Sequence, residues 1–421
     1  MIMEPKIRLK GFSGEWENTS LGQAAFDFKY GINAAAKEYD GHNKYLRITD
    51  IDDSSREFCY EDLTSPNTDL TNCNDYLMKV GDIVVARTGA SVGKTYKYRE
   101  KDGTVYFAGF LIRFTANNDY DSDFVFYNTL TKGYDKHIKL VSQRSGQPGV
   151  NVSELQSFAF NAPSLPEQRA LATFFTSLNN QISAAEKRLA SLKQVKAASL
   201  QAMFPQEGET TPKLRFKGCE GEWKKVKLGE VFEHIKNNSL SRDNLATEGL
   251  VMNVHYGDIL IKFGAYIDTS HDDIPFIKDD NLANTMLRMG KLQCGDVIIA
   301  DAAEDNTVGK CSELIVNNAN IVSGLHTIVI RPKLKFASCY LGYYMNSPSY
   351  HNQLLPHIQG SKISSISKKA VDSTYINYPS LSEQRQIASY FTSLDRQISA
   401  QSSKISKLKQ IKSACLDQMF V

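Results

Sequence analysis

Two stretches of the chain carry apolar residues at alternating steps of three and four positions, one after Pro166 and one after Ser382. This spacing places an apolar stripe along one face of a helix and is typical of coiled coils. The pattern predicts two long helices, at residues 166–204 and 382–421. The stripe residues predicted to pair are Phe175, Leu178, Ile182, Leu189, Leu192, Phe391, Leu394, Ile398, Ile405 and Leu408.

Near the end of each stretch the apolar positions shift by one residue, to Val195 and Ile411. We expect a short irregularity in each helix at that point. A helix of about 38 residues would be about 57 Å long, which exceeds one small domain and favours pairing of the two helices with each other. Lysines beside the stripes are predicted to form solvated outer faces. They are Lys193, Lys196, Lys407, Lys409 and Lys412.

The rest of the chain, residues 1–165 and 205–381, carries short apolar runs between turn residues. Such a pattern is typical of mixed α/β domains with many short strands. Strands are expected at residues 80–87, 105–114, 297–300 and 321–330, and short helices at 123–130 and 336–345.

The chain also repeats itself. Residues 5–11 recur at 212–218, and both copies continue into Gly-Glu-Trp and Leu-Gly. A second match pairs residues 163–169 with 379–385 and continues without a gap through the helices. Between these anchors the copies diverge. Each unit is far longer than a solenoid repeat, so we expect two α/β modules, each followed by a helix, and an internal pseudo-twofold axis if the helices pair antiparallel.

Composition narrows the function only slightly. A chain of 421 residues with 42% hydrophobic and 23% charged residues predicts two or more globular domains. The net charge of +2 neither requires nor excludes a nucleic-acid partner. The seven cysteines form no close pair of the zinc-finger type. No long apolar run predicts a membrane span or a signal segment, so a cytoplasmic location is expected.

Motifs for catalysis are missing from the sequence. Gly89 to Thr95 resembles a P-loop, but three residues separate its glycines where four are needed, and a strand pattern follows. A glycine-framed turn that presents Lys94 fits phosphate or base contact better. We find no methyltransferase tetrapeptide, no paired nuclease carboxylates and no histidine cluster. The sequence therefore predicts no catalytic residue, no metal ligand and no cofactor bound by this chain.

The helix starts Leu-x-Glu-Gln-Arg at 165–169 and 381–385, with the duplicated module starts, resemble the specificity subunits of type I restriction-modification systems. The resemblance covers essentially the whole chain. It implies target recognition domains at 1–165 and 205–381 that each read one half of a bipartite double-stranded DNA. It also implies that the helices at 166–204 and 382–421 pair antiparallel, set the spacer and dock two methyltransferase subunits.

The resemblance implies cofactors only in the partners: S-adenosylmethionine in the methyltransferase subunits, and ATP with Mg in restriction subunits, of which two can join. Base reading needs forked or amphoteric side chains on exposed loops. The candidates are Arg47, Thr49, Arg87, Ser91, Lys94, Gln143, Arg144, His255, Tyr256, Asn306, Lys310, Gln359, Ser361 and Lys362. Two alternatives stay open, a stand-alone enzyme and a coiled-coil scaffold without DNA readout.

Overall fold

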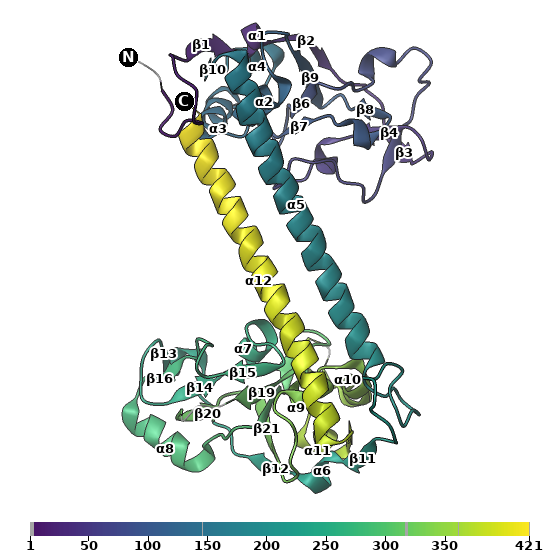
Figure 1. Ribbon diagram of the computed structural model, residues 1–421, viewed down its shortest axis with the longest axis vertical. Helices are drawn as coiled ribbons and strands as arrows, with labels where there is room; N and C mark the ends of the chain where they lie inside the picture. Colours follow the sequence, from purple (N-terminus) through teal and green to yellow (C-terminus); the bar gives the residue numbers. More distant parts are fainter. Residues whose placement is uncertain (1–3, 145, 316–318, 361, 421) are drawn as a thin grey trace. The chain divides into compact units, whose positions relative to one another are not determined.

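The computed structural model describes residues 4–144, 146–315, 319–360 and 362–420, which form two compact units. Unit 1 comprises Met1–Lys187 with Ser402–Val421, and unit 2 comprises Arg188–Gln401. Each unit contains one mixed α/β module, the start of the long helix that follows this module, and the end of the other long helix (Figure 1). The predicted fold class, two mixed α/β modules with two long helices, is confirmed.

In unit 1 the module is built on a four-stranded antiparallel sheet in the order β2–β9–β6–β7. A separate pair, β4 and β8, runs parallel. The strands are β1 (Glu17–Ser20), β2 (Ala25–Tyr30), β3 (Ala36–Glu38), β4 (Lys44–Leu46), β5 (Thr64–Pro66), β6 (Asp82–Ala86), β7 (Thr95–Lys97), β8 (Val105–Phe107), β9 (Leu111–Ala116) and β10 (Ala159–Ala162). The short helices are α1 (Leu21–Ala24), α2 (Ser122–Asn128), α3 (Lys132–Val141) and α4 (Val152–Gln156), with 3-10 turns at Ile48–Asp50, Asn74–Tyr76 and Glu100–Asp102.

In unit 2 the main sheet has five strands in the order β12–β21–β17–β19–β15, and a second sheet has the order β13–β16–β14–β20. The strands are β11 (Lys224–Lys227), β12 (Phe232–Ile235), β13 (Leu245–Ala246), β14 (Met252–Val254), β15 (Tyr266–Asp268), β16 (Phe276–Ile277), β17 (Val297–Ala300), β18 (Ala302–Ala303), β19 (Cys311–Ile315), β20 (Ile321–Ser323), β21 (Thr327–Pro332), β22 (Ser364–Ser365) and β23 (Tyr375–Tyr378). The short helices are α6 (Leu228–Val231), α7 (Tyr256–Ile261), α8 (Asp280–Gly290), α9 (Tyr340–Met345), α10 (Pro348–Leu354) and α11 (Lys368–Ser373), with 3-10 turns at Arg242–Asn244 and Leu355–His357.

Two strands expected from the sequence are each broken by a tight turn. The segment 105–114 forms β8 and the start of β9, separated by residues 108–110, and the segment 321–330 is divided in the same way at 324–326. A glycine stands in each turn because the backbone passes another chain segment closely. A Cβ on Gly109 would lie 3.2 Å from the carbonyl oxygen of Ile32, and one on Gly324 would lie 2.5 Å from Nδ2 of Asn253.

The repeated Glu-Gln-Arg motif fastens each module to its long helix, α5 (Leu165–Ala202) or α12 (Leu381–Met419). Gln168 donates from Nε2 to the carbonyl of Pro163 at 2.9 Å, and its Oε1 accepts from the backbone of Asp121 at 3.0 Å. Gln384 makes the same two bonds, to Pro379 and from Ala337, both at 2.9 Å. A buried amide with both ends bonded sets the direction in which each helix leaves its module.

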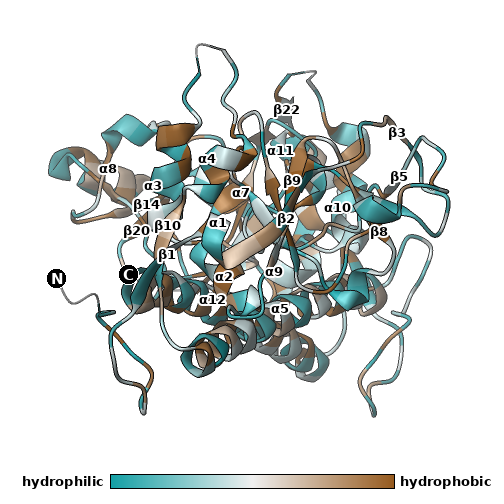
Figure 2. Ribbon diagram, turned by 90° about the horizontal axis from the view of Figure 1, so that it is seen from above, coloured by the Kyte–Doolittle hydropathy of each residue, from teal (hydrophilic) through white to brown (hydrophobic). Residues whose placement is uncertain are grey.

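Within each unit the two helix segments run antiparallel. In unit 1, Phe175 packs on Phe420 with ring centroids 5.6 Å apart, and Glu186 pairs with Lys409 at 2.8 Å. The residue numbers of α12 therefore fall in the direction in which those of α5 rise. In unit 2 the ring of Phe204 stacks on that of Phe391 at 5.9 Å. Both helices carry hydrophilic and hydrophobic residues (Figure 2). Of the stripe residues, Phe175, Leu178, Ile182, Phe391, Leu394 and Ile405 are buried, and Leu189, Leu192, Ile398 and Leu408 are half-buried.

The predicted irregularity in the helices is wrong. Both helices continue through the region, with Val195 at 47% and Ile411 at 48% exposure on the outside. The half-buried residues at the next stripe position are Lys196 and Lys412, which also corrects the prediction that these two lysines lie on a solvated face. A lysine can take a stripe position because its aliphatic stem packs on apolar neighbours while the ammonium reaches a polar group.

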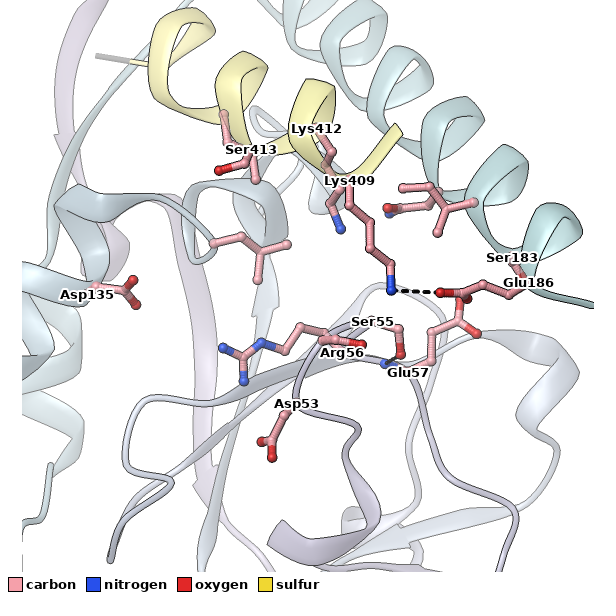
Figure 3. Close-up of a pocket in the computed structure, with 15 residues that line it drawn as sticks. Asp53, Ser55, Arg56, Glu57, Asp135, Ser183, Glu186, Lys409, Lys412 and Ser413 are labelled. Atoms are coloured by element: carbon pink, nitrogen blue, oxygen red, sulfur yellow. Dashed lines mark hydrogen bonds and ion pairs between the residues drawn. The ribbon is translucent and has the colours of Figure 1, made fainter. Parts of the chain in front are cut away.

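The two stripe lysines differ in their partners. In unit 2, Lys196 pairs with Asp395 at 2.5 Å. In unit 1, Lys412 points into a cavity of about 380 Å³ lined by both helices and by the loop that carries Arg56 (Figure 3). Among the residues that the structure describes, Lys412 has no hydrogen-bond or ion-pair partner, and burial lowers the pKa of its ammonium.

Candidate nucleic-acid interface

One place in unit 1 gathers loop residues at the ends of three strands. The backbone N–H of Arg87, directly after β6, donates to the carbonyl of Phe110 at 3.0 Å. Ala108, in the same turn, donates to the carbonyl of Leu46 at the end of β4 at 3.0 Å. Val150 closes the place from the loop after α3 by donating to the carbonyl of Arg87 at 2.8 Å. We call this place the strand-end corner.

Unit 2 contains the same corner with the same backbone bonds. Asp301 donates to the carbonyl of His326 at 3.1 Å, and Gly324 donates to that of Val254 at 2.8 Å. Ile366 donates to the carbonyl of Asp301 at 3.0 Å. Asp301 therefore stands in unit 2 where Arg87 stands in unit 1, and His326 stands where Phe110 does.

The guanidinium of Arg87 is held by stacking and has free donors. It lies over the ring of Tyr30, with Cζ 4.5 Å from the ring centroid. In the described parts of the chain the guanidinium makes no hydrogen bond or ion pair, and its buried Nε has no partner. Phe110 stands beside it with 63% of its surface exposed. The corner of unit 1 thus offers a fixed, forked set of donors next to an exposed aromatic ring.

The corner of unit 2 presents an acceptor in place of these donors. Nδ1 of His326 lies 3.2 Å from Oδ1 of Asp301. The ring of His326 also meets that of Tyr256 edge-on, at 5.3 Å between centroids, and Tyr256 lies 4.6 Å from the ring of His255. Burial raises the pKa of the Asp301 carboxyl, while its interactions with His326 and Lys368 act against this rise.

Comparison with known proteins assigns the family. The pattern of the type I restriction modification DNA specificity domain matches residues 14–194 and again residues 220–410. These two matches cover most of the chain. The protein belongs to the type I restriction-modification DNA specificity family.

Individual members of this specificity family are distant in sequence. The chain is 20% identical over 387 residues to the type I restriction enzyme MjaVIII specificity subunit of Methanocaldococcus jannaschii, covering 89% of this chain and 84% of the relative. The crystal structure of the type I restriction-modification S subunit from M. genitalium is similar with a TM-score of 0.59 at 15% identity, covering 100% of this chain and 99% of that one. A chain from a structural study of the assembly and conformational transition of the type I R-M system gives 0.54 at 19%, covering 95% and 96%.

Several of the predicted base readers of this specificity protein lie at or next to a corner. Arg87 lies in the corner itself. Arg47 follows β4 and donates two hydrogen bonds to the carboxylate of Asp50, from Nε at 2.9 Å and from Nη2 at 2.7 Å. Thr49 is exposed on the same short turn. In unit 2, Tyr256 is half-buried at the corner, while His255 is buried and its Nδ1 accepts from the backbone of Gly257 at 3.2 Å.

Two of the predicted lysines, Lys94 and Lys310, are turned inward. The ammonium of Lys94 donates to the carbonyl of Ile51 at 2.8 Å and pairs with Asp53 at 2.9 Å, and only 7% of the lysine is exposed. Lys310 donates in the same way to the carbonyl of Leu260 at 2.8 Å. Each lysine thus ties the glycine turn of its module to the helical turn after β4 or β14. Consistent with the sequence, β7 and not a helix follows Lys94.

Other predicted readers lie on loops around the corner. Gln143 and Arg144 are exposed, and Arg144 is bonded to the carbonyls of Val141 and Gln143 and paired with Glu154 at 2.5 Å. Gln359, Lys362 and Asn306 are exposed in unit 2, and Ser91 is half-buried in unit 1. Ser361 lies outside the described residues.

Sequence reasoning missed four corner residues: Tyr30, Phe110, Asp301 and His326. Phe110 and His326 fell inside segments expected to be continuous strands, so their exposure was hidden. The available signal for a turn was a glycine just before each residue, Gly109 one position before Phe110 and Gly324 two positions before His326.

The described residues contain no group of three or more His, Cys, Asp or Glu placed to hold a metal ion. The cysteines that the structure describes are all free thiols. No helix in the described ranges is both long and apolar enough to cross a membrane.

Proposed function

We propose that this chain is the non-catalytic specificity subunit of a type I restriction-modification complex, in which each unit reads one half of a bipartite double-stranded DNA target. The observation that carries the proposal is that one family domain occurs twice, with the same corner frame and different side chains in it. Arg87 and Phe110 in unit 1 are replaced by Asp301 and His326 in unit 2. A subunit that reads two unlike half-sites needs a constant frame with variable readers.

The segments at 1–165 and 205–381 act as the target recognition domains, and those at 166–204 and 382–421 act as spacer helices. Two helices of 38 and 39 residues, paired along their length, would give an element of fixed length, which suits a fixed gap between half-sites. In this proposal the helices also dock two methyltransferase subunits, which carry S-adenosylmethionine. Two restriction subunits with ATP and Mg can complete the complex, which is cytoplasmic.

The proposed base readers are the sequence candidates that the structure leaves accessible, together with the corner residues. Forked and amphoteric side chains on the loops around the corner can reach base edges in the major groove. The exposed Lys362 and the glycine turns are suited to backbone phosphates. Lys94 and Lys310 support these loops from inside, so the proposal does not depend on their contact with DNA.

Modified-base sequencing tests the proposal. The chain is expressed with its neighbouring methyltransferase subunit in a host without DNA methylation, and the genome is read. We expect a split motif with a fixed gap, methylated on both strands. A soluble complex that methylates no defined sequence would contradict DNA specificity, and failure to form any complex would favour a coiled-coil scaffold without DNA readout.

A further inference from the structure

The two corners carry opposite charges at one shared backbone position. The backbone N–H of Arg87 donates to Phe110, and that of Asp301 donates to His326. The backbone carbonyls of Arg87 and Asp301 accept from Val150 and Ile366, respectively. The two residues therefore hold the same backbone position in their modules, while the chemistry of their side chains differs. Arg87 brings donors alone, whereas an ionised Asp301 brings acceptors alone.

The acceptors of Asp301 are largely unused. In the described part of the chain its carboxylate has one hydrogen-bond partner, Nδ1 of His326, and the side chain keeps 26% of its surface exposed. An ionised carboxylate can accept about four hydrogen bonds, so most of this capacity stays available.

His326 holds this carboxylate in one orientation through their hydrogen bond. Its φ angle of 54° lies in the left-handed region that residues other than glycine seldom adopt, and its ring is held between Asp301 and Tyr256. About half of the His326 side chain, 51%, is exposed at the same surface. The pair is therefore a fixed acceptor beside an exposed ring, the counterpart of Arg87 beside Phe110.

We propose that Asp301, oriented by His326, reads a cytosine in the half-site of unit 2 by accepting a hydrogen bond from its exocyclic N4 amino group. This inference rests on the proposed function. A carboxylate repels DNA phosphates, so an acid in this position favours contact with a base edge that donates, and the cytosine amino group is such a donor in the major groove. It also disfavours guanine, whose N7 and O6 are both acceptors. Arg87 in the matching position reads a guanine of the other half-site.

The experiment is modified-base sequencing of the wild-type complex and of complexes with Asp301→Asn and Arg87→Lys. In the wild type we expect a cytosine at one position of the second half-site. Asp301→Asn should weaken the preference for this cytosine by about 5- to 150-fold and admit adenine, which an amide reads through N6 and N7. The first half-site and the gap should not change. Arg87→Lys keeps the charge but loses the fork, and should relax one position of the first half-site only.

A matched control is Glu304→Gln, which neutralises an exposed acid on the same loop and should leave every base preference unchanged. Thermal unfolding and methyltransferase binding check that each variant is folded. If Asp301→Asn fails to fold, His326→Asn serves in its place, because losing the orienting ring should relax the same position.

The inference is overturned if folded Asp301→Asn and His326→Asn complexes methylate the wild-type motif with unchanged preference. It is also overturned if the wild-type second half-site requires no cytosine. Failure of the proposed function is distinct, because the wild-type complex itself would then give no split motif.

Discussion

The guanidinium of Arg8 donates two hydrogen bonds to the carboxylate of Glu167, from Nε to Oε1 at 2.8 Å and from Nη2 to Oε2 at 2.8 Å. The pair joins the first residues of unit 1 to the start of α5. In unit 2, Arg215 and Glu383 make the same pair, at 2.6 and 2.7 Å. This bidentate contact explains why an arginine near each module start and a glutamate at each helix start recur together in the sequence.

Breaking this pair should destabilise the unit. The Glu167 side chain is only 2% exposed. Glu167→Gln removes the negative charge that pairs with the guanidinium of Arg8 in this largely desolvated site. We expect a loss of about 2–3 kcal/mol in the free energy of unfolding. Urea unfolding measures it, with the exposed Glu15→Gln as control. A loss no larger than that of the control would show that the pair adds nothing to stability.

The stripe lysines provide a second test. Asp395 accepts from Lys196 and from the hydroxyl of Tyr343 at 2.8 Å, but in unit 1 the matching residue is Asn179, whose Nδ2 donates to the hydroxyl of Tyr127 at 3.0 Å. Asn179 and Lys412 line the same cavity. Asn179→Asp should supply the missing counter-ion and stabilise the protein by about 1 kcal/mol near pH 7.

The lowered pKa of Lys412 also makes the stability of the protein depend on pH. Because burial lowers the pKa of Lys412, the folded protein holds fewer protons than the unfolded chain between the lowered pKa and the usual value of 10.5. Wild-type stability should therefore gain from this lysine as the pH rises through that window, and Asn179→Asp should reduce the gain. The measurement is the difference between the two unfolding curves from pH 7 to pH 10. Asn180→Asp, on the exposed side of α5, is the control, and equal effects of both variants would refute the prediction.

Glu313 should make unit 2 less stable as the pH rises. Burial raises the pKa of Glu313 to about 7, although its carboxylate accepts from the backbone of Cys339 at 2.7 Å and of Gly342 at 3.0 Å. Between pH 4.5 and about 7, Glu313 therefore keeps its proton in the folded protein but has lost it in the unfolded chain. Stability from this group is full below pH 4.5 and falls by up to about 3 kcal/mol as the pH passes 7.

Glu313→Gln removes this titration and should flatten the fall in stability between pH 4.5 and 7. Urea unfolding at several pH values measures the slope, and Glu248→Gln, an exposed substitution in the same unit, should keep the wild-type slope. An unchanged slope in Glu313→Gln would mean that other groups cause the fall.

Some features of the molecule follow from local pattern and others do not. The long helices were predictable because a heptad stripe depends on spacing alone. The continuation of the stripe through Lys196 was not, because the Asp395 carboxylate that pairs with this lysine comes from a distant segment of the chain. The inward direction of Lys94 was hidden for the same reason, since the carbonyl of Ile51 that binds it lies on another loop.

The exposed ring of Phe110 allows base contact to be separated from phosphate contact. If the Phe110 ring packs against a base edge beside Arg87, Phe110→Ala should weaken binding to the target duplex by about 1 kcal/mol. The salt dependence of affinity should not change, because a phenylalanine ring neutralises no phosphate. Lys362→Ala should instead weaken binding to all sequences and reduce the slope of log affinity against log salt concentration by about 1. Titration of labelled duplexes with the methyltransferase complex at several salt concentrations measures both. Equal affinity of wild type and Phe110→Ala for the target would place this ring outside the interface, and a changed slope would show that the substitution disturbs phosphate contacts.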